Sequence, residues 1–409
     1  MKEIIILIIL YINPVSIIGQ NSDSLNHYID LALKNNPELL SEYKAYEASL
    51  EKVPQYKSLA DPIISFGYFI SPVETRLGPQ IAKLSVSQMF PWFGTLDAKG
   101  KQAAFLAMAK MEQYNASANK LVYQVKKEYF KIFFIRISID YVLKQIDLIN
   151  MLEKQALIKT ETGQTSIVDV LQFQMEKEEL MNKVKNLKNK DSEISGHFNL
   201  LLNKDKSSEI SIPDSLDIIT PKEFLIDSVL QNNPKIKYSE NIINYSEKLV
   251  KESKLSSYPK LGLGLDYVFV GKRQDINPDN NGRDVIMPMV SITIPINRKK
   301  YKAKIKESKL KNEESILKKE AVKNDLTAEF ETGLSDYYTA VNDYKLYEDL
   351  IIKGEQVLRI LKTAYETSGK DYDQVLNMHR KVLNYKIKKI EAGINAKIAE
   401  SFIEYLSNN

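Results

Sequence analysis

Residues 121–150 read LVYQVKKEYFKIFFIRISIDYVLKQIDLIN, and apolar side chains recur in them at alternating intervals of four and three residues. Only Glu128 breaks the apolar character of this stripe. A mean period of 3.5 residues predicts a long α-helix that packs beside other helices as in a coiled coil. The stripe consists of Leu121, Val125, Glu128, Ile132, Ile135, Ile139, Val142, Ile146 and Ile149.

The same spacing returns 205 residues later in a second, smaller and more aromatic stripe that runs from Leu326 to Gly354. Other landmarks recur in the same order at nearly the same offset, which indicates an internal duplication. We therefore predict two repeats, over 20–213 and 214–409. The recurring landmarks are Asn35-Asn36-Pro37 with Asn232-Asn233-Pro234, Pro62 with Pro259, Pro91 with Pro295, and Val170-Leu171 with Val375-Leu376.

Prolines divide each repeat into elements. No proline lies between Pro91 and Pro213 or after Pro295. Proline costs about 3 kcal/mol in a helix interior, so both tracts can be continuous helix. The first repeat is predicted to contain a short helix near 37–53, a long helix over 92–158 and a helix over 166–203. The second repeat is predicted to repeat this order near 234–256, over 297–366 and over 371–406.

Two predicted β-hairpins, over 63–90 and 260–296, precede the long helices. In the second, Leu261, Leu263 and Leu265 share one face, and Gly262 and Asp266 lie on the other. The strands, expected over 63–70, 81–90, 260–270 and 285–296, have the length of strands that cross a bilayer at a tilt. A hairpin packed on a soluble core would give the same alternation.

The first nineteen residues predict a secretory signal peptide. Lys2 precedes an apolar run over 4–12, and the small residues Ser16 and Gly19 follow. A membrane anchor is the alternative reading, but Asn13 and Pro14 interrupt the run before it is long enough to span a bilayer. Later segments are too often interrupted by charge to form a membrane helix, so any membrane crossing would have to use strands.

The amino-acid composition excludes some classes of function and argues against others. The 409 residues include 44% apolar and 27% charged residues, the formal net charge is +4, and there are no cysteines. Disulfides, thiolate catalysis and lipidation on an N-terminal cysteine are therefore excluded. A nucleic-acid-binding coiled coil would usually carry a concentrated basic face, which a charge of +4 does not favour. The histidines His27, His197 and His379 lack metal-ligand spacing, so we expect no enzyme, cofactor or metal site.

The segment Gln88-Met89-Phe90-Pro91-Trp92-Phe93-Gly94 resembles a motif of TolC-like outer-membrane efflux proteins, in which a strand turns into the long helix. The resemblance covers both repeats. It implies a mainly α chain with a small β part, whose duplicated helical hairpins form an α-barrel tunnel. It also implies that four strands per chain join a shared transmembrane β-barrel, of twelve strands in a homotrimer. Independently, four strands cannot close a barrel, and open edges are not tolerated in lipid.

The function that this resemblance implies is an outer-membrane channel subunit of a tripartite efflux or type I secretion system. Such a subunit is a passive duct that lies in the outer membrane of a Gram-negative bacterium and extends into the periplasm. Its expected partners are outer-membrane lipid, a periplasmic membrane-fusion adaptor and an inner-membrane pump of the RND or ABC type, without nucleic acid. The rival hypothesis is a soluble periplasmic coiled-coil scaffold or adaptor.

The resemblance also places three aromatic residues, Phe90, Trp92 and Phe93, at the membrane interface of the barrel. Aromatic girdles are typical of that position. Ordinary packing at a strand-to-helix junction is the alternative explanation.

Two helix turns are the candidate periplasmic tip. Glycine permits the positive φ that ends a helix, and serine or aspartate can cap the next one, so turn stereochemistry alone accounts for Gly163, Ser166, Gly369 and Asp371. The resemblance assigns Gly163, Ser166 and Gly369 to adaptor contacts, and Asp169, Tyr365, Lys370, Asp371 and Asp373 to the gate. Gln374 and Asn377 replace acidic residues that family members often carry, which weakens the expectation of cation binding.

Overall fold

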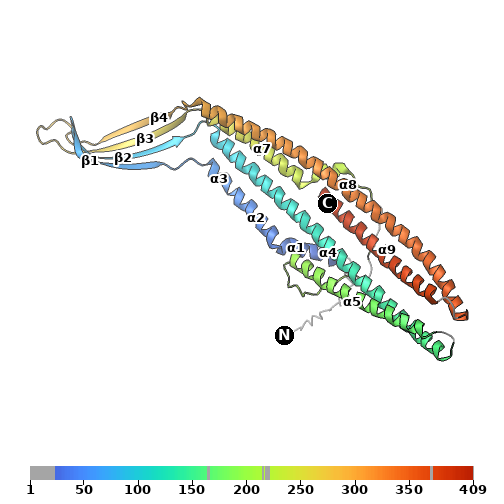
Figure 1. Ribbon diagram of the computed structural model, residues 1–409. Helices are drawn as coiled ribbons and strands as arrows, with labels where there is room; N and C mark the ends of the chain where they lie inside the picture. The colour runs from blue at the N-terminus through green and yellow to red at the C-terminus, as the bar shows by residue number, and fades with distance from the viewer. Residues whose placement is uncertain (1–23, 164–165, 214–215, 217–221, 369–371, 409) are drawn as a thin grey trace, which may run out of the picture. The chain divides into compact units, whose positions relative to one another are not determined.

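A computed structural model describes residues 24–163, 166–213, 216, 222–368 and 372–408 (Figure 1). The chain is mainly α-helical with one four-stranded antiparallel sheet, which confirms the predicted fold class. The predicted signal peptide lies outside the described residues. The elements are α1 (Ser24–Asn35), α2 (Pro37–Leu50), α3 (Lys52–Lys57), β1 (Ile63–Thr75), β2 (Gly78–Phe90), α4 (Thr95–Glu161), α5 (Ile167–Leu201), α6 (Ile226–Asn232), α7 (Pro234–Leu255), β3 (Lys260–Val270), β4 (Val285–Thr293), α8 (Arg298–Ser368) and α9 (Tyr372–Ser407).

The chain forms two compact units, and each unit combines segments from both sequence repeats. Unit 1 comprises residues 1–35, 124–220 and 346–394, and unit 2 comprises residues 36–123, 221–345 and 395–409. The long helices α4 and α8 contribute residues to both units. The division into repeats 20–213 and 214–409 therefore describes the sequence, and it stays a prediction about duplication.

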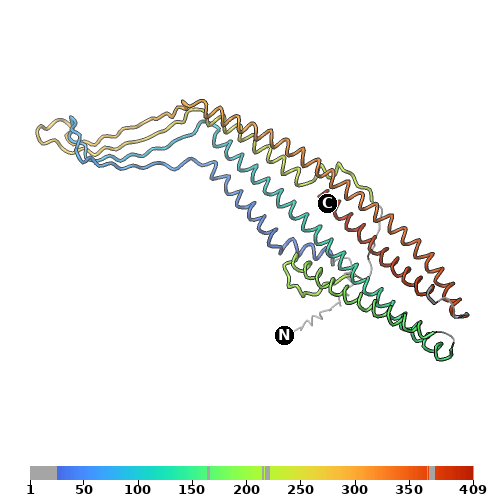
Figure 2. Tube along the Cα trace, in the orientation of Figure 1, coloured from blue at the N-terminus to red at the C-terminus, as the bar shows by residue number. Residues whose placement is uncertain are grey.

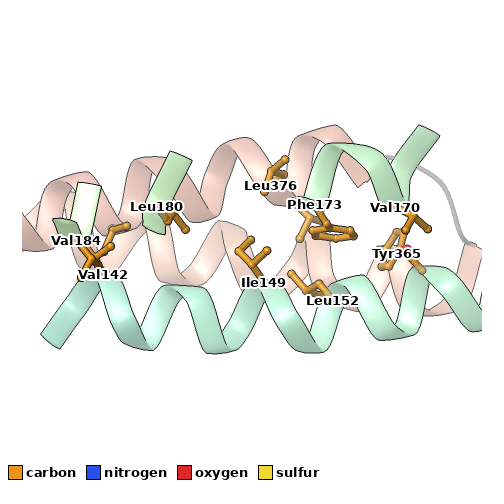
Figure 3. Packing of buried hydrophobic residues seen from close by; sticks show 12 residues of the cluster. Val142, Ile149, Leu152, Val170, Phe173, Leu180, Val184, Tyr365 and Leu376 are labelled. Atoms are coloured by element: carbon orange, nitrogen blue, oxygen red, sulfur yellow. The ribbon is translucent and has the colours of Figure 1, made fainter. Parts of the chain in front are cut away.

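Unit 1 is built around a core shared by four helices. The C-terminal part of α4 lies beside α5, and the C-terminal part of α8 lies beside α9 (Figure 2). Figure 3 shows buried side chains from these helices pointing into the space between them. Val142 and Ile149, which belong to the predicted stripe of residues 121–150, are part of this core. Its members are Val142, Ile149, Leu152, Ala156, Val170, Phe173, Leu180, Val184, Tyr365, Val375, Leu376 and Leu383.

Unit 2 contains the sheet and a second helical core. The second predicted stripe supplies Leu326, Phe330, Tyr337 and Ala340, which pack against residues of α6, α7 and α9. Gly333 occupies a stripe position, and a Cβ there would lie 2.9 Å from Cδ1 of Phe402. Small residues in the second stripe thus let α9 pack closely against α8. The α6, α7 and α9 residues of this core are Val229, Ile236, Ala396, Ala399, Ile403 and Leu406.

The repeated Asn-Pro landmarks are helix starts. The side chain of Asn36 accepts a hydrogen bond from the Leu39 amide at 3.1 Å, and Asn233 accepts one from the Lys235 amide at 2.8 Å. In both helices the proline that follows occupies the first turn, where its missing N–H costs nothing. Asn233 also donates from Nδ2 to the Leu406 carbonyl at 2.8 Å, which ties α7 to the end of α9.

The first hairpin is longer than the sequence predicted. β1 and β2 extend through most of residues 71–79, which we expected to be a loop. Pro72 does not end β1, because the register shifts between Tyr68 and Val73 and β1 lies at one edge of the sheet. The short helices α1 and α6, which precede the two Asn-Pro starts, were not predicted.

Candidate functional site

The sheet, in the order β1-β2-β3-β4, has one continuous apolar face. Its register pairs Leu84 with both Phe66 and Tyr267, and it pairs Leu263 with Val290. Most of these side chains are exposed, up to 72% for Val290. An exposed apolar face of this extent marks a surface that contacts lipid or another protein. The apolar residues of the face are Ile64, Phe66, Tyr68, Ala82, Leu84, Val86, Phe90, Leu261, Leu263, Leu265, Tyr267, Phe269, Ile286, Pro288, Val290 and Ile292. The polar residue Gln88, the cross-strand partner of Leu263, lies among them.

The opposite face of the same sheet is small and polar at its centre. Asp266 of β3 is fully buried and forms an ion pair with Lys83 of β2, whose side chain is 36% exposed. Ser85 is the direct cross-strand partner of Asp266, and Ser87 is that of Gly264. Apolar residues also lie on this face, because Met287 pairs with Asp266 and Met289 with Gly264. The sheet thus has one apolar face and one mixed face that carries a buried ion pair, and two faces of different polarity are typical of a membrane barrel.

The three predicted girdle residues lie at the helical end of the sheet. Phe90 is the last residue of β2 and pairs with Leu261, so it lies on the apolar face. The ring of Trp92 stacks on Tyr258 with 5.2 Å between centroids and 16° between planes. The ring of Phe93 is 79% exposed. The structure thus brings Phe90, Trp92 and Phe93 together, and their role as a membrane girdle stays a prediction.

At the other end of the sheet, the two hairpin loops are hydrogen-bonded to each other. The amide of Gly271 donates to the Pro79 carbonyl and that of Gly282 to the Leu77 carbonyl, each at 2.7 Å. Gly78 has a φ of +126°, and a Cβ there would lie 1.8 Å from the Gly271 carbonyl oxygen. Only glycine fits this position. The loops therefore stabilise each other.

The second loop has its own polar contacts. Asp284 accepts hydrogen bonds from the Tyr267 hydroxyl at 2.6 Å and from the Val270 amide at 2.9 Å. A hydrogen bond from Arg273 lowers the pKa of Asp275 to about 2. The longer loop between β3 and β4 is thus an ordered feature, although its sequence is mostly polar.

Part of the predicted tip is described. Gly163 has a φ of +73° at the end of α4, and the Ser166 hydroxyl accepts a hydrogen bond from the Val168 amide at 3.2 Å. Both observations agree with helix-turn stereochemistry. Gly369, Lys370, Asp371 and the side chain of Asp373 lie outside the described residues.

Tyr365 lies in the core of unit 1, where its side chain is 3% exposed. Nζ of Lys159 lies 4.1 Å from the centroid of its ring and 3.4 Å from its carbonyl oxygen. Burial first, and then the negative charge of Asp169, raise the pKa of the Tyr365 phenol, which keeps it protonated. The structure therefore brings the predicted gate residues Asp169 and Tyr365 together, and it adds Lys159.

A second charged contact joins the two repeats inside unit 1. Glu176 of α5 is 4% exposed and forms an ion pair with Arg380 of α9. Together with Glu179 and Lys183 they line a polar cavity of about 400 Å³. Glu176 is the buried partner, whereas the Arg380 side chain is 47% exposed. Removing Arg380 would leave the buried carboxylate uncompensated, so this contact restrains how α5 and α9 pack.

Sequence reasoning missed Lys159, Glu176 and Arg380. Only weak sequence features mark two of these residues. Lys159 is a basic residue in the last turn of α4. Glu176 falls three residues after Phe173 and four before Leu180, so it is an acid within an apolar stripe. Neither signal identifies the partner, because that depends on which helices pack together.

His379 of α9 is expected to make unit 1 sensitive to acid. Burial, and secondarily the charges of Lys362 and Lys386, lower its pKa from 6.5 to about 4. Between these values an unfolded chain binds a proton that the folded chain does not, so stability falls as the pH falls. We expect a loss on the order of 1–2 kcal/mol after allowance for partial exposure of the ring.

The measurement is amide hydrogen exchange of α9 at pH 7 and at pH 4.5 in the wild type and in His379→Gln. Exchange of the wild type, corrected for its intrinsic pH dependence, should increase at pH 4.5 relative to the variant. An equal response of both proteins would show that His379 does not titrate in this range. His197→Gln is the matched control on α5.

Other common sites are absent from the part of the chain that the structure describes. Within those residues there is no group of three or more His, Cys, Asp or Glu side chains that could hold a metal ion. No described helix combines the length and the apolar character needed to span a bilayer.

A four-stranded antiparallel sheet joined to paired long helices is a fold that this chain shares with solved outer-membrane channel proteins. Among solved structures, the chain is similar to the outer membrane protein VceC of Vibrio cholerae, with a TM-score of 0.77 and 14% identity over 94% of this chain and 96% of that one. The CmeC outer membrane channel of Campylobacter jejuni gives a TM-score of 0.75 and 15% identity over 94% and 86% of the two chains.

The open state of the MtrE outer membrane channel of Neisseria gonorrhoeae gives a TM-score of 0.75 and 15% identity over 94% of this chain and 89% of that one. No protein-family model matches the sequence, and no curated protein matches it. At 14–15% identity these likenesses show the fold, and the function has to be argued from the residues.

Proposed function

We propose that this chain is the outer-membrane channel subunit of a tripartite efflux or type I secretion system, located in the outer membrane of a Gram-negative bacterium. The observation that carries the proposal is the two-sided sheet, which is apolar and exposed on one face and carries the ion pair of Lys83 and Asp266 on the other, mixed face. Among the described residues, the outermost strands β1 and β4 each have one edge without a partner strand. Such edges are not tolerated in lipid, so copies of the chain must join to close a barrel.

A homotrimer is the proposed assembly. Three copies would give twelve strands, enough for an aqueous passage, whereas the eight strands of a dimer would have an interior filled by side chains. The helices of both repeats would then line a passive duct through the periplasm. The duct needs no catalytic residue, and its proposed partners are a membrane-fusion adaptor at the tip and an inner-membrane pump.

The rival function is a soluble periplasmic scaffold, and one experiment separates the two. The chain without residues 1–19 would be refolded in detergent, examined by size-exclusion chromatography with light scattering, and added to a planar lipid bilayer. We expect a trimer that requires detergent and produces discrete conductance steps. A monomer that stays dissolved without detergent would refute the channel proposal.

The gate is a separate proposal for Asp169, Tyr365, Lys370, Asp371 and Asp373. Its support is that Asp169 and buried Tyr365 interact electrostatically at the turn end of unit 1. Each polar contact across such a tip is worth about 0 to 1 kcal/mol, so a docked partner could open it. The turns with Gly163, Ser166 and Gly369 are the proposed adaptor contacts.

The double substitution Asp169→Ala with Lys370→Ala is expected to raise single-channel conductance, because it removes opposite charges that hold neighbouring hairpins together. The matched control is Asp140→Ala with Lys144→Ala, which removes an exposed ion pair of α4 without changing the net charge. Conductance that stays at the wild-type value in the first variant would remove Asp169 and Lys370 from the gate.

A further inference from the structure

An apolar pocket of about 270 Å³ lies where the sheet meets the helices of unit 2. Register places Phe90, Leu261, Leu263 and Val290 of this pocket on the apolar face of the sheet. Gly94, with a φ of +78°, turns the chain after Phe93 into α4. The complete lining is Phe90, Pro91, Trp92, Phe93, Pro259, Leu261, Leu263 and Val290.

The size and lining of the pocket indicate what could fill it. Pockets for drug-sized ligands have volumes of about 300–1,000 Å³ and contain a few converging polar groups. This pocket is smaller, and all its lining residues carry apolar side chains. A segment of a hydrocarbon chain fits such a site better than a polar solute does.

The segment that leads from β4, one of the strands that line the pocket, into α8 carries a concentrated positive charge. Segment 297–306, which is separated from the end of β4 by three residues, contains six basic residues and no acidic residue. Arg298, Lys299 and Lys300 form the first turn of α8, and all three are exposed. An apolar pocket beside clustered cations matches a molecule with a hydrocarbon chain and an anionic head.

Barrel closure would leave this pocket open to lipid. Closing the barrel uses the free edges of β1 and β4, whereas the pocket lies on the face of β2, β3 and β4. Trp92 and Tyr258 stack beside it, and tryptophan and tyrosine are enriched where hydrocarbon meets head groups. The pocket therefore lies at the level of the lipid head groups in the leaflet that faces the helices.

From these observations we infer that the pocket is a binding site for an anionic glycerophospholipid. One acyl chain fills the space between Trp92, Phe93 and Leu263, and the phosphate is held by Arg298, Lys299 and Lys300. This inference rests on the proposed function, because it requires the apolar face of the sheet to be in a bilayer. It adds a specific lipid site that a general aromatic girdle does not require.

Trp92 is the single tryptophan of the chain, which makes a direct test possible. Bromine atoms on a lipid acyl chain quench tryptophan fluorescence on contact. The full mature chain would be reconstituted in phosphatidylcholine vesicles that contain a small fraction of either brominated phosphatidylglycerol or brominated phosphatidylcholine. We expect the anionic lipid to be at least about fivefold more effective, the preference that one cation near an anionic lipid provides.

A triple variant, Arg298→Gln with Lys299→Gln and Lys300→Gln, should lose this preference and still be quenched by vesicles made entirely of brominated phosphatidylcholine. The charge-matched control is Lys309→Gln with Lys323→Gln and Lys345→Gln, further along α8, and it should keep the preference. Equal quenching by both lipids in the wild type would overturn the inference, as would a preference that survives in the triple variant.

The same experiment separates failure of this inference from failure of the proposed function. Vesicles made entirely of brominated phosphatidylcholine should quench Trp92 strongly if the apolar face is in a bilayer, whether or not a specific site exists. Absence of quenching in those vesicles, together with failure of the protein to float with them in a density gradient, would refute the membrane location itself. Strong quenching without selectivity would refute only the lipid site.

Discussion

Leu84→Lys is expected to prevent insertion of the chain into a bilayer as a stable oligomer. Leu84 lies in the middle of β2, on the apolar face, opposite Phe66 and Tyr267. A lysine on the lipid face of a barrel costs about 2–4 kcal/mol at the bilayer midplane, and a trimer would carry three such residues. The measurement is the fraction of refolded protein that runs as an oligomer in unheated detergent gels and gives conductance in planar bilayers.

The adjacent substitution Ser85→Lys is the control. Ser85 lies on the other face of the sheet, directly opposite the carboxylate of Asp266 in β3, so a lysine there faces a negative charge instead of lipid. We expect Ser85→Lys to assemble like the wild type. Equal tolerance of both lysines, or greater tolerance of Leu84→Lys, would mean that the apolar face does not contact lipid.

Phe173→Ala is expected to produce the largest loss of packing in unit 1. The Phe173 side chain is fully buried in a cluster to which α4, α5, α8 and α9 all contribute (Figure 3). Truncating a buried phenylalanine costs about 3–5 kcal/mol, because it removes contacts and leaves a cavity. Protection of the α5 amides against hydrogen exchange should fall by about two to three orders of magnitude.

Met175→Ala is the matched control for this substitution. Met175 lies two residues further along α5, and its side chain is 65% exposed. Surface substitutions usually change stability by less than about 0.5 kcal/mol, so its exchange should remain close to that of the wild type. A similar loss of protection in both variants would show that the buried cluster is not what holds α5 in place.

The proposed gate residues differ in how deeply they are buried. Tyr365 belongs to the same buried cluster as Phe173, whereas Asp169 is only partly buried. Opening the gate by separating only exposed charge pairs would cost little free energy. Opening it by moving the Tyr365 ring would also require the buried cluster to repack. The ion pair between Glu176 and Arg380 further restrains α5 and α9. We therefore expect a docked partner to move the hairpins as packed units and to leave the cluster intact.

Much of the architecture was determined by the sequence itself. The two 3.5-residue stripes, the long tracts without proline and the two Asn-Pro starts predicted the long helices to within a few residues of their observed ends. Alternation predicted which strand residues share a face, and cross-strand register agrees with it. These features are local, because the periodicity of a helix or strand and the stereochemistry of proline act on neighbouring residues.

Tertiary structure alone decided the contacts between distant segments. The ammonium group of Lys159 lies over the ring of Tyr365. Two ion pairs, Glu176 with Arg380 and Asp266 with Lys83, are further contacts of this kind. Each pair joins residues on different helices or strands, and in all three pairs one partner lies in residues 20–213 and the other in residues 214–409. The apolar pocket beside Trp92 likewise needs β2, β3 and β4 in register. Sequence spacing limits which residues can share a face, but partner choice depends on the packing of whole elements, which only the folded chain provides.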